Sequence, residues 1–293
     1  MGCKWPKKTE EFMSIFFSER HTDDVCFSFK VKPLISTYSE FQKIDIYDTE
    51  DFGRVLVMDE RVMLTEKDER IYHEMITHVA MAVNPEIKDV LIIGGGDGGA
   101  LRELARYETI RKIDMVEIDE LVPRLSREYL PHLASAFDDP RFSLIIADGL
   151  KYVRTTDQTY DLIIVDSTDP FGPGESLFTR EFYGNCYGIL GDRGILVNQH
   201  ESPFYEEDAL EVKSTFAKTE SIFPVVKLYQ AHIPTYPSGH WLFGFMSKAL
   251  DPVQDLKAEA WQALGLETYY YNTKLHLGSF ALPNYVLALI GKL

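Results

Sequence analysis

Residues 90–99 read VLIIGGGDGG, and this stretch decides the fold. An apolar run without polar alternation is typical of a strand buried on both faces of a parallel sheet. The glycines allow a tight turn close to a ligand, and a helix is predicted to begin near Ala100. About 20 residues further on, a second apolar run ends in Glu117, where an acid can bind both hydroxyls of a ribose. The pattern predicts a nucleoside-binding α/β domain.

The glycine loop carries an acid, Asp97. The dinucleotide-binding pattern G-x-G-x-x-G has no acid there, and Asp97 would repel a pyrophosphate while attracting a cation. The loop therefore favours a cationic nucleoside, such as a sulfonium, over NAD. The alternative is an ordinary strand–turn–helix loop in which Asp97 only caps the helix.

Further apolar runs also end in an acid or amide, namely residues 144–148 (LIIAD), 162–166 (LIIVD) and 195–199 (ILVNQ). Ligands bind at the carboxyl ends of strands in open α/β sheets, so these side chains are expected around one crevice. Several carboxylates in one crevice need a cationic ligand or a metal to offset their repulsion. No metal is predicted, although magnesium among the aspartates is an alternative. His73 and His78, at i and i+5, point too far apart around a helix to share zinc.

The chain divides into two parts. Residues 1–67 contain the predicted strands 25–31, 41–47 and 54–58, with a hairpin turn at 48–53. From Asp68 to Val83 the apolar spacing becomes helical, and strands then alternate with helices as far as Lys248. We therefore predict a small N-terminal antiparallel β domain over 1–67 and a doubly wound α/β sheet over 68–293. The Pro- and Gly-rich loop 166–178 is expected to be a movable lid.

The composition restricts the partners. Lys and Arg minus Asp and Glu gives 30 − 46 = −16, so nucleic acid and anionic membranes are poor partners. The three cysteines are odd in number and widely separated, which argues against a disulfide framework. No apolar run is long enough to span a bilayer. A cytoplasmic protein is expected.

Motifs along most of the chain, from about residue 10 to the C-terminus, resemble those of spermidine synthase, a polyamine aminopropyltransferase. The matching segments are 72–75 (YHEM), 94–99 (GGGDGG), 166–170 (DSTDP) with 172–173 (GP), 234–239 (PTYPSG), 271–273 (YNT) with His276, and 280–283 (FALP). The resemblance implies a methyltransferase-type Rossmann-like domain behind the small β domain, assembled as a homodimer or homotetramer.

The resemblance also implies the reaction. The aminopropyl group of decarboxylated S-adenosylmethionine moves to putrescine, giving spermidine and 5′-methylthioadenosine. The donor is a co-substrate, and no cofactor is expected. Glu117 is expected to hold the ribose, Asp148 the adenine, and Asp97 with Asp166 the ammonium of the aminopropyl arm. The implied donor-binding set is Gln42, His73, Gly94, Gly96, Asp97, Glu117, Ile118, Asp148 and Gly149.

The implied catalytic residues are Asp166, as general base, and Tyr72, which orients the attacking amine. The implied acceptor-binding residues are Asp169, Gln199, Glu201 and Tyr236. Departures from the family pattern at Glu60, Arg70 and Phe171 leave the acceptor open, with agmatine, cadaverine or a longer polyamine as alternatives. An S-adenosylmethionine-dependent methyltransferase and a non-catalytic polyamine-binding protein are more distant alternatives.

Overall fold

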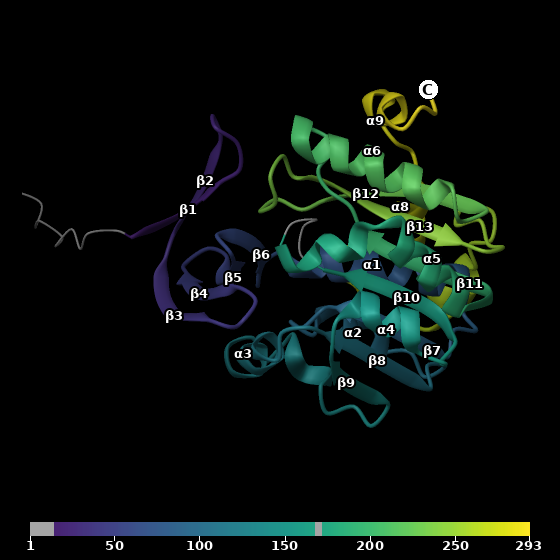
Figure 1. Ribbon diagram of the computed structural model, residues 1–293, viewed down its shortest axis with the longest axis horizontal. Coiled ribbons are helices and arrows are strands. Elements are labelled where there is room, and N and C mark those ends of the chain that lie inside the picture. The colour runs from purple at the N-terminus through teal and green to yellow at the C-terminus, as the bar shows by residue number, and fades with distance from the viewer. Residues whose placement is uncertain (1–14, 168–171) are drawn as a thin grey trace, which may run out of the picture.

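The computed structural model describes residues 15–167 and 172–293 (Figure 1). Two small antiparallel sheets come first. β1 (Phe16–Arg20) and β2 (Cys26–Lys30) form a hairpin, and a four-stranded sheet follows with β3 (Lys32–Tyr38), β4 (Lys43–Thr49), β5 (Gly53–Met58) and β6 (Arg61–Thr65). Thr49 pairs with Gly53, so the predicted hairpin turn is confirmed. The sequence analysis missed β1, β3 and β6, which lack a clean apolar alternation.

The large sheet has the strand order β12-β13-β11-β10-β7-β8-β9. Its strands are β7 (Asp89–Gly94), β8 (Lys112–Glu117), β9 (Phe142–Ile146), β10 (Tyr160–Asp166), β11 (Leu190–Gln199), β12 (Val225–His232) and β13 (His240–Ser247). The pairs from β9 through β11 are parallel, whereas β13 is antiparallel to both β11 and β12. The predicted α/β architecture is confirmed, but the alternation of strand and helix ends at the β12–β13 hairpin.

Alternate side chains of the central strand face opposite layers of the fold. Val90 and Ile92 of β7 join a core with α1 (Glu69–Val83), α2 (Gly99–Ala105) and α7 (Ala258–Ala263). Leu91 and Ile93 join a second core with α4 (Gly149–Thr155), η2 (Gly172–Phe178) and α5 (Arg180–Ile189). Burial on both faces explains why β7 carries no polar alternation.

Helix α1 is buried nearly all round, because every residue except Arg70 is buried. Glu74, near its middle, accepts hydrogen bonds from the backbone N–H groups of Tyr269, Tyr270 and Tyr271 at 2.7, 2.7 and 2.9 Å. Arg70 pairs with the same carboxylate at 3.0 Å. Because these bonds join residues far apart in sequence, they hold the C-terminal region against α1.

The four-stranded sheet packs on the large domain through α3 (Leu121–Tyr129). Val122 and Leu125 of α3 share a core with Ile44, Ile46 and Leu56. The predicted division at 67/68 falls between Thr65, which ends β6, and Glu69, which begins α1. The division into two domains at this point stays a prediction.

The remaining helices complete the chain. They are η1 (Ala134–Ala136), α6 (Glu206–Glu220), α8 (Thr273–Ser279) and α9 (Asn284–Leu289). Helix α6 packs on β12 and β13 through Val212 and Phe216. Among residues 15–167 and 172–293, no helix is both long enough and apolar enough to cross a bilayer.

Candidate active site

The candidate site lies where the chain order of the parallel strands reverses. From β7, the sheet continues to β8 on one side and to β10 on the other. Such a switch point opens a crevice at the carboxyl ends of the strands. Gly94 at the end of β7 pairs with Asp166 at the end of β10, and the Gly95 N–H donates to the Asp166 carbonyl at 2.7 Å. Two cavities meet here, and Tyr72, Ser167 and Tyr236 line both.

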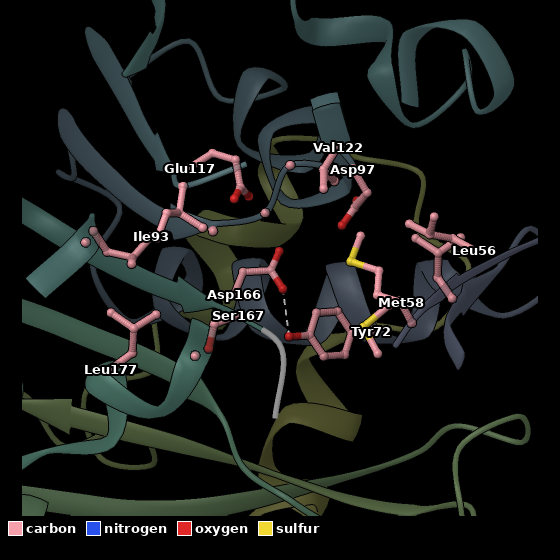
Figure 2. Close-up of a pocket in the computed structure, with 18 of the residues that line it drawn as sticks. Leu56, Met58, Tyr72, Ile93, Asp97, Glu117, Val122, Asp166, Ser167 and Leu177 are labelled. Atoms are coloured by element: carbon pink, nitrogen blue, oxygen red, sulfur yellow. Dashed lines mark hydrogen bonds between the residues drawn. The ribbon is translucent and has the colours of Figure 1, made fainter. Parts of the chain in front are cut away.

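The glycine loop permits this close approach of the two strands. Gly94 has φ of +80°, and a Cβ there would lie 2.2 Å from the Asp166 carbonyl oxygen. Only glycine therefore fits. Asp97 follows in the loop, and its Oδ1 accepts the N–H of Gly99 at 2.7 Å. The N-cap of α2 is Gly98 rather than Asp97, so this bond ties Asp97 to the first residue of the helix while its carboxylate lines the first cavity (Figure 2).

Glu117 lies at the end of β8, as predicted, and lines the first cavity. Its Oε1 accepts the N–H of Asp119 at 3.0 Å. Burial is the largest influence on the Glu117 carboxyl and raises its pKa to about 7. The neighbouring backbone N–H groups favour the ionised form and partly oppose this increase. Gln42 reaches the same region from the connection between β3 and β4 and donates to Asp119 Oδ2 at 3.0 Å. The cavity therefore spans the boundary between the two sheets.

The first cavity is also lined by Ile118, Asp148 and Gly149. Asp148 is the N-cap of α4, where its Oδ1 accepts the N–H of Lys151 at 2.9 Å. A Cβ on Gly149 would lie 2.7 Å from Ile93 Cγ2, so this wall is closely packed. All nine donor-binding residues implied by the resemblance line this cavity, namely Gln42, His73, Gly94, Gly96, Asp97, Glu117, Ile118, Asp148 and Gly149.

Asp166 and Tyr72 lie at the junction of the two cavities. The Tyr72 hydroxyl donates to Asp166 Oδ1 at 2.7 Å (Figure 2). Burial and the nearby charge of Asp97 raise the pKa of Asp166 to about 6, although His73 and Tyr72 oppose this shift. A buried carboxylate whose pKa approaches neutrality is suited to general base catalysis.

His73 lies between two carboxylates. Its Nδ1 is 2.7 Å from Glu69 Oε2, and its Nε2 is 3.2 Å from Asp97 Oδ1. Burial by itself would lower the pKa of His73, but Asp97 and Glu69 outweigh burial and raise the pKa to about 10. The two carboxylate contacts and the raised pKa both favour the imidazolium form of His73 at neutral pH. The sequence analysis identified His73 as a donor-site residue but did not detect Glu69, whose spacing of four residues on α1 was the available signal.

Ligand atoms of His73, Asp97 and Asp166 lie within 4.8 Å of one another, a spacing that would also suit a metal ion. Both ring nitrogens of His73 are directed at carboxylates, however, so the ring offers no lone pair to an ion. His78 has different neighbours, Tyr107 and Glu103, and cannot join the cluster. The geometry favours an organic ammonium, and the absence of a metal stays a prediction.

The second cavity continues from Tyr72 toward α6 and the β1–β2 hairpin. Gln199, Glu201 and Tyr236, three of the four predicted acceptor residues, line it, whereas Asp169 lies outside the described residues. The Gln199 side chain is buried, and its Oε1 has no hydrogen-bond partner among the described groups. The Tyr236 hydroxyl donates to the Met63 carbonyl at 2.6 Å. The described part of the predicted lid contains η2, and Leu177 from η2 lines the first cavity.

Several lining residues were not found from the sequence. Leu56, Met58 and Leu64 form an apolar wall of the first cavity, and Glu19, His21, Trp241, Glu207, Asp208 and Glu211 line the second. Most come from the small sheets and α6, where no local motif indicated function. Glu60 and Arg70 are absent from the described lining of both cavities, so an effect of either on acceptor choice would be indirect.

Comparison with known proteins gave consistent matches. The spermine/spermidine synthase domain matches residues 69–257, and the spermidine synthase tetramerisation domain matches residues 15–66. The polyamine aminopropyltransferase of Alkaliphilus oremlandii is 60% identical over 281 residues, covering 96% of this chain and 99% of that protein. The enzyme of the same name from Clostridium perfringens is 62% identical over 275 residues, covering 94% and 97%.

Solved structures agree in fold. A spermidine synthase in complex with the transition state analogue AdoDATO has a TM-score of 0.92 and 41% sequence identity, with 95% of this chain and 96% of that chain covered. The spermidine synthase of Thermotoga maritima has a TM-score of 0.91 and 40% identity, with 96% of each chain covered.

Proposed function

The chain belongs to the spermidine synthase family of polyamine aminopropyltransferases, and we propose that it transfers the aminopropyl group of decarboxylated S-adenosylmethionine to putrescine. The products are spermidine and 5′-methylthioadenosine. One observation carries the proposal: the half-buried Asp97 and the buried Asp166 lie close together where the first cavity meets an acidic second cavity. Two acids at this junction suit a donor with a sulfonium and an ammonium.

The donor is assigned to the first cavity. We assign Glu117 to the ribose hydroxyls, Asp148 with the neighbouring Gly149 to the adenine, and Gln42 to the ribose or sulfonium side; all four residues line the first cavity. Asp97 and Asp166 receive the ammonium of the aminopropyl arm. Ordinary S-adenosylmethionine carries a carboxylate on that arm, and its repulsion by two partly desolvated acids disfavours it by several kcal/mol. This argues against a methyltransferase.

The transfer is a direct displacement at carbon. The lone pair of the acceptor nitrogen attacks the aminopropyl carbon bonded to sulfur, the C–S bond breaks, and its electrons leave the sulfur as a neutral thioether. The acceptor amine must first lose a proton, which costs roughly 4–5 kcal/mol at pH 7 for a pKa of ~10.4. Asp166 accepts that proton and passes it to solvent. The Tyr72 hydroxyl, which donates to Asp166, keeps a lone pair to accept an N–H of the amine.

The acceptor is assigned to the second cavity. Trp241 and Met63 offer apolar contact to methylenes, while Gln199 and Glu201 receive the distal ammonium. A longer polyamine is the second candidate acceptor, because Glu207, Asp208 and Glu211 of α6 extend the acidic lining outward. Agmatine and cadaverine are further alternatives.

Assembly and location complete the proposal. The match to a tetramerisation domain supports a homo-oligomer, for which we propose a homotetramer, with a homodimer as the alternative. The net charge of −16 argues against nucleic acid as a partner. A cytoplasmic location and the absence of a cofactor remain proposals.

A panel of amines tests this function. The enzyme is incubated with decarboxylated S-adenosylmethionine and, separately, putrescine, cadaverine, agmatine or spermidine, and products are identified by mass. We expect putrescine to give the highest kcat/KM. Preference for another amine would overturn the putrescine assignment, and formation of S-adenosylhomocysteine from intact S-adenosylmethionine would show a methyltransferase.

A further inference from the structure

We propose that Glu69 is a positioning residue of this reaction, which acts through His73 to hold Asp97 in place for the ammonium of the donor. The proposal rests on the proposed function, because it concerns the same ammonium. Glu69 is the first residue of α1, and His73 lies one turn further along the helix. The chain of contacts runs from α2 through Glu69 and His73 to the glycine loop.

Glu69 acts through its neighbours because both of its oxygens are already engaged. Arg102 of α2 donates to Oε1 at 2.9 Å and to Oε2 at 3.0 Å. His73 Nδ1 approaches Oε2 at 2.7 Å. The Glu69 side chain is only 1% exposed, although the residue borders the donor cavity. Because both oxygens already accept from cationic groups and the side chain is almost fully buried, we assign Glu69 an indirect role through His73.

The contacts of His73 require a proton on each ring nitrogen. A neutral ring would direct one lone pair at a carboxylate oxygen, either of Glu69 or of Asp97. The ring is also fixed in position, since a Cβ at Gly99 would lie 2.2 Å from His73 Cε1. Glu69 therefore holds both the orientation and the charge of a ring that cannot move elsewhere.

These contacts determine the position and the charge of Asp97. Its Oδ1 is held by the Gly99 N–H at 2.7 Å and faces His73 Nε2 at 3.2 Å. Burial would raise the pKa of Asp97, but the charge and hydrogen bond of His73 outweigh burial and lower it. Asp97 thus stays ionised beside Asp166, and its carboxylate faces the cavity (Figure 2).

Charged groups from several elements surround the pair of Glu69 and His73. Glu69 of α1, Asp97 of the glycine loop and Asp166 of β10 act on His73. Arg102 of α2 and His132 lie on the other side of Glu69, 2.9 and 3.9 Å from its Oε1. If Glu69 became neutral, Arg102 and His73 would remain as neighbouring like charges. The pKa of His73 would then fall from about 10, and the ring would lose its proton as the pH rises.

Glu69→Gln is the main test, because glutamine keeps the shape and removes the charge. Binding of two ligands is measured by calorimetry: decarboxylated S-adenosylmethionine, which has the ammonium, and methylthioadenosine, which lacks it. We expect the variant to bind the first roughly 10-fold to 100-fold more weakly and the second within about threefold of wild type. The loss should grow between about pH 7 and 9 in the variant only.

Glu103→Gln is the matched control. Glu103 is also a buried acid paired with Arg102, at 3.0 Å, but its other partners are Arg106 and His78 rather than His73. Its variant should bind both ligands as wild type does. An equal loss of both ligands in Glu69→Gln, or no loss of either, would overturn the positioning role. If wild-type protein bound neither ligand, the proposed function itself would fail.

Two measurements remain decisive if Glu69→Gln does not fold. Glu69→Asp keeps the charge and should retain most of the discrimination between the two ligands. In wild-type protein, ¹⁵N chemical shifts of the His73 ring should show both nitrogens protonated at about pH 8, well above the usual pKa of ~6.5. A neutral ring at that pH would refute the proposal.

Discussion

Replacement of Asp166 by asparagine tests whether Asp166 is the general base, because it removes the base and keeps the other contacts of the site. The amide has nearly the shape of the carboxyl, and its oxygen can still accept the Tyr72 hydroxyl, which lies 2.7 Å from Asp166 Oδ1. The change therefore removes proton acceptance without opening a cavity. Because methylthioadenosine has no aminopropyl arm, its affinity should stay within about threefold of wild type.

The size of the effect follows from the two titrating groups. An acceptor amine with a pKa of ~10.4 is almost fully protonated at pH 7. Asp166, with its pKa raised to about 6, is mostly ionised at that pH and can take the proton. A positioned base contributes roughly 10²-fold to 10⁴-fold, so kcat should fall by about that factor. The measurement is methylthioadenosine release, by chromatography, at saturating donor and putrescine.

The pH profile adds an independent check. The pKa of Asp166 is raised, so its base form is present above about pH 6 and is lost as the pH falls through that value. In wild type, kcat/KM for putrescine should decline on the acid side near pH 6, at saturating donor. In Asp166→Asn the inflection near pH 6 should be absent, and the rate should instead fall about tenfold per pH unit across the acidic and neutral range, as the fraction of free amine falls. Asp157→Asn, which removes one exposed charge, is the control. A kcat near wild type in Asp166→Asn would refute the assignment of the base.

Two other buried acids give predictions of different kinds. Burial raises the pKa of Glu117 to about 7, so wild-type affinity for methylthioadenosine should increase as the pH rises through 7 and the carboxylate becomes able to accept from both ribose hydroxyls. Glu117→Gln should weaken the binding of methylthioadenosine by about 1.5–3 kcal/mol, roughly 10-fold to 150-fold, and should remove the pH dependence of this affinity. Calorimetry at pH 6 and 8 measures both effects. A wild-type affinity that does not change with pH would contradict the ribose role. Glu74→Ala leaves three backbone N–H groups without their acceptor and should destabilise the fold by about 3 kcal/mol or more. The melting temperature should then fall by about 6–12 °C in scanning calorimetry, whereas a shift below about 2 °C would show that the C-terminal region is held by other contacts.

The sequence predicted the parts of the fold that local pattern determines. The run before Gly94 indicated a strand buried on both faces, and the spacing from Asp68 to Val83 indicated α1. It did not predict β3, because the sequence KPLISTY does not alternate regularly between polar and apolar residues. This segment is a strand because it pairs with β4. The β12–β13 hairpin was missed for a similar reason: its antiparallel place beside β11 depends on tertiary contacts.

The candidate site was predictable where one motif carried one function. Asp97, Glu117 and Asp166 each follow an apolar run, and parallel strands bring their ends together. What could not be predicted is how the acids are paired. The contact between His73 and Asp97 depends on how α1 packs against α2, and no spacing in the sequence specifies that packing.

Because α1 is covered on nearly every side, it limits how this enzyme could be redesigned. Nearly any new side chain along this helix would overpack or empty a core, at a typical loss of 1–3 kcal/mol or more. Directed evolution toward a new amine should therefore accumulate its changes on α6, where Glu207, Asp208 and Glu211 reach the second cavity from exposed or half-buried positions. The sequence of α1, which carries Tyr72 and His73, would then stay constant while the residues around the acceptor change.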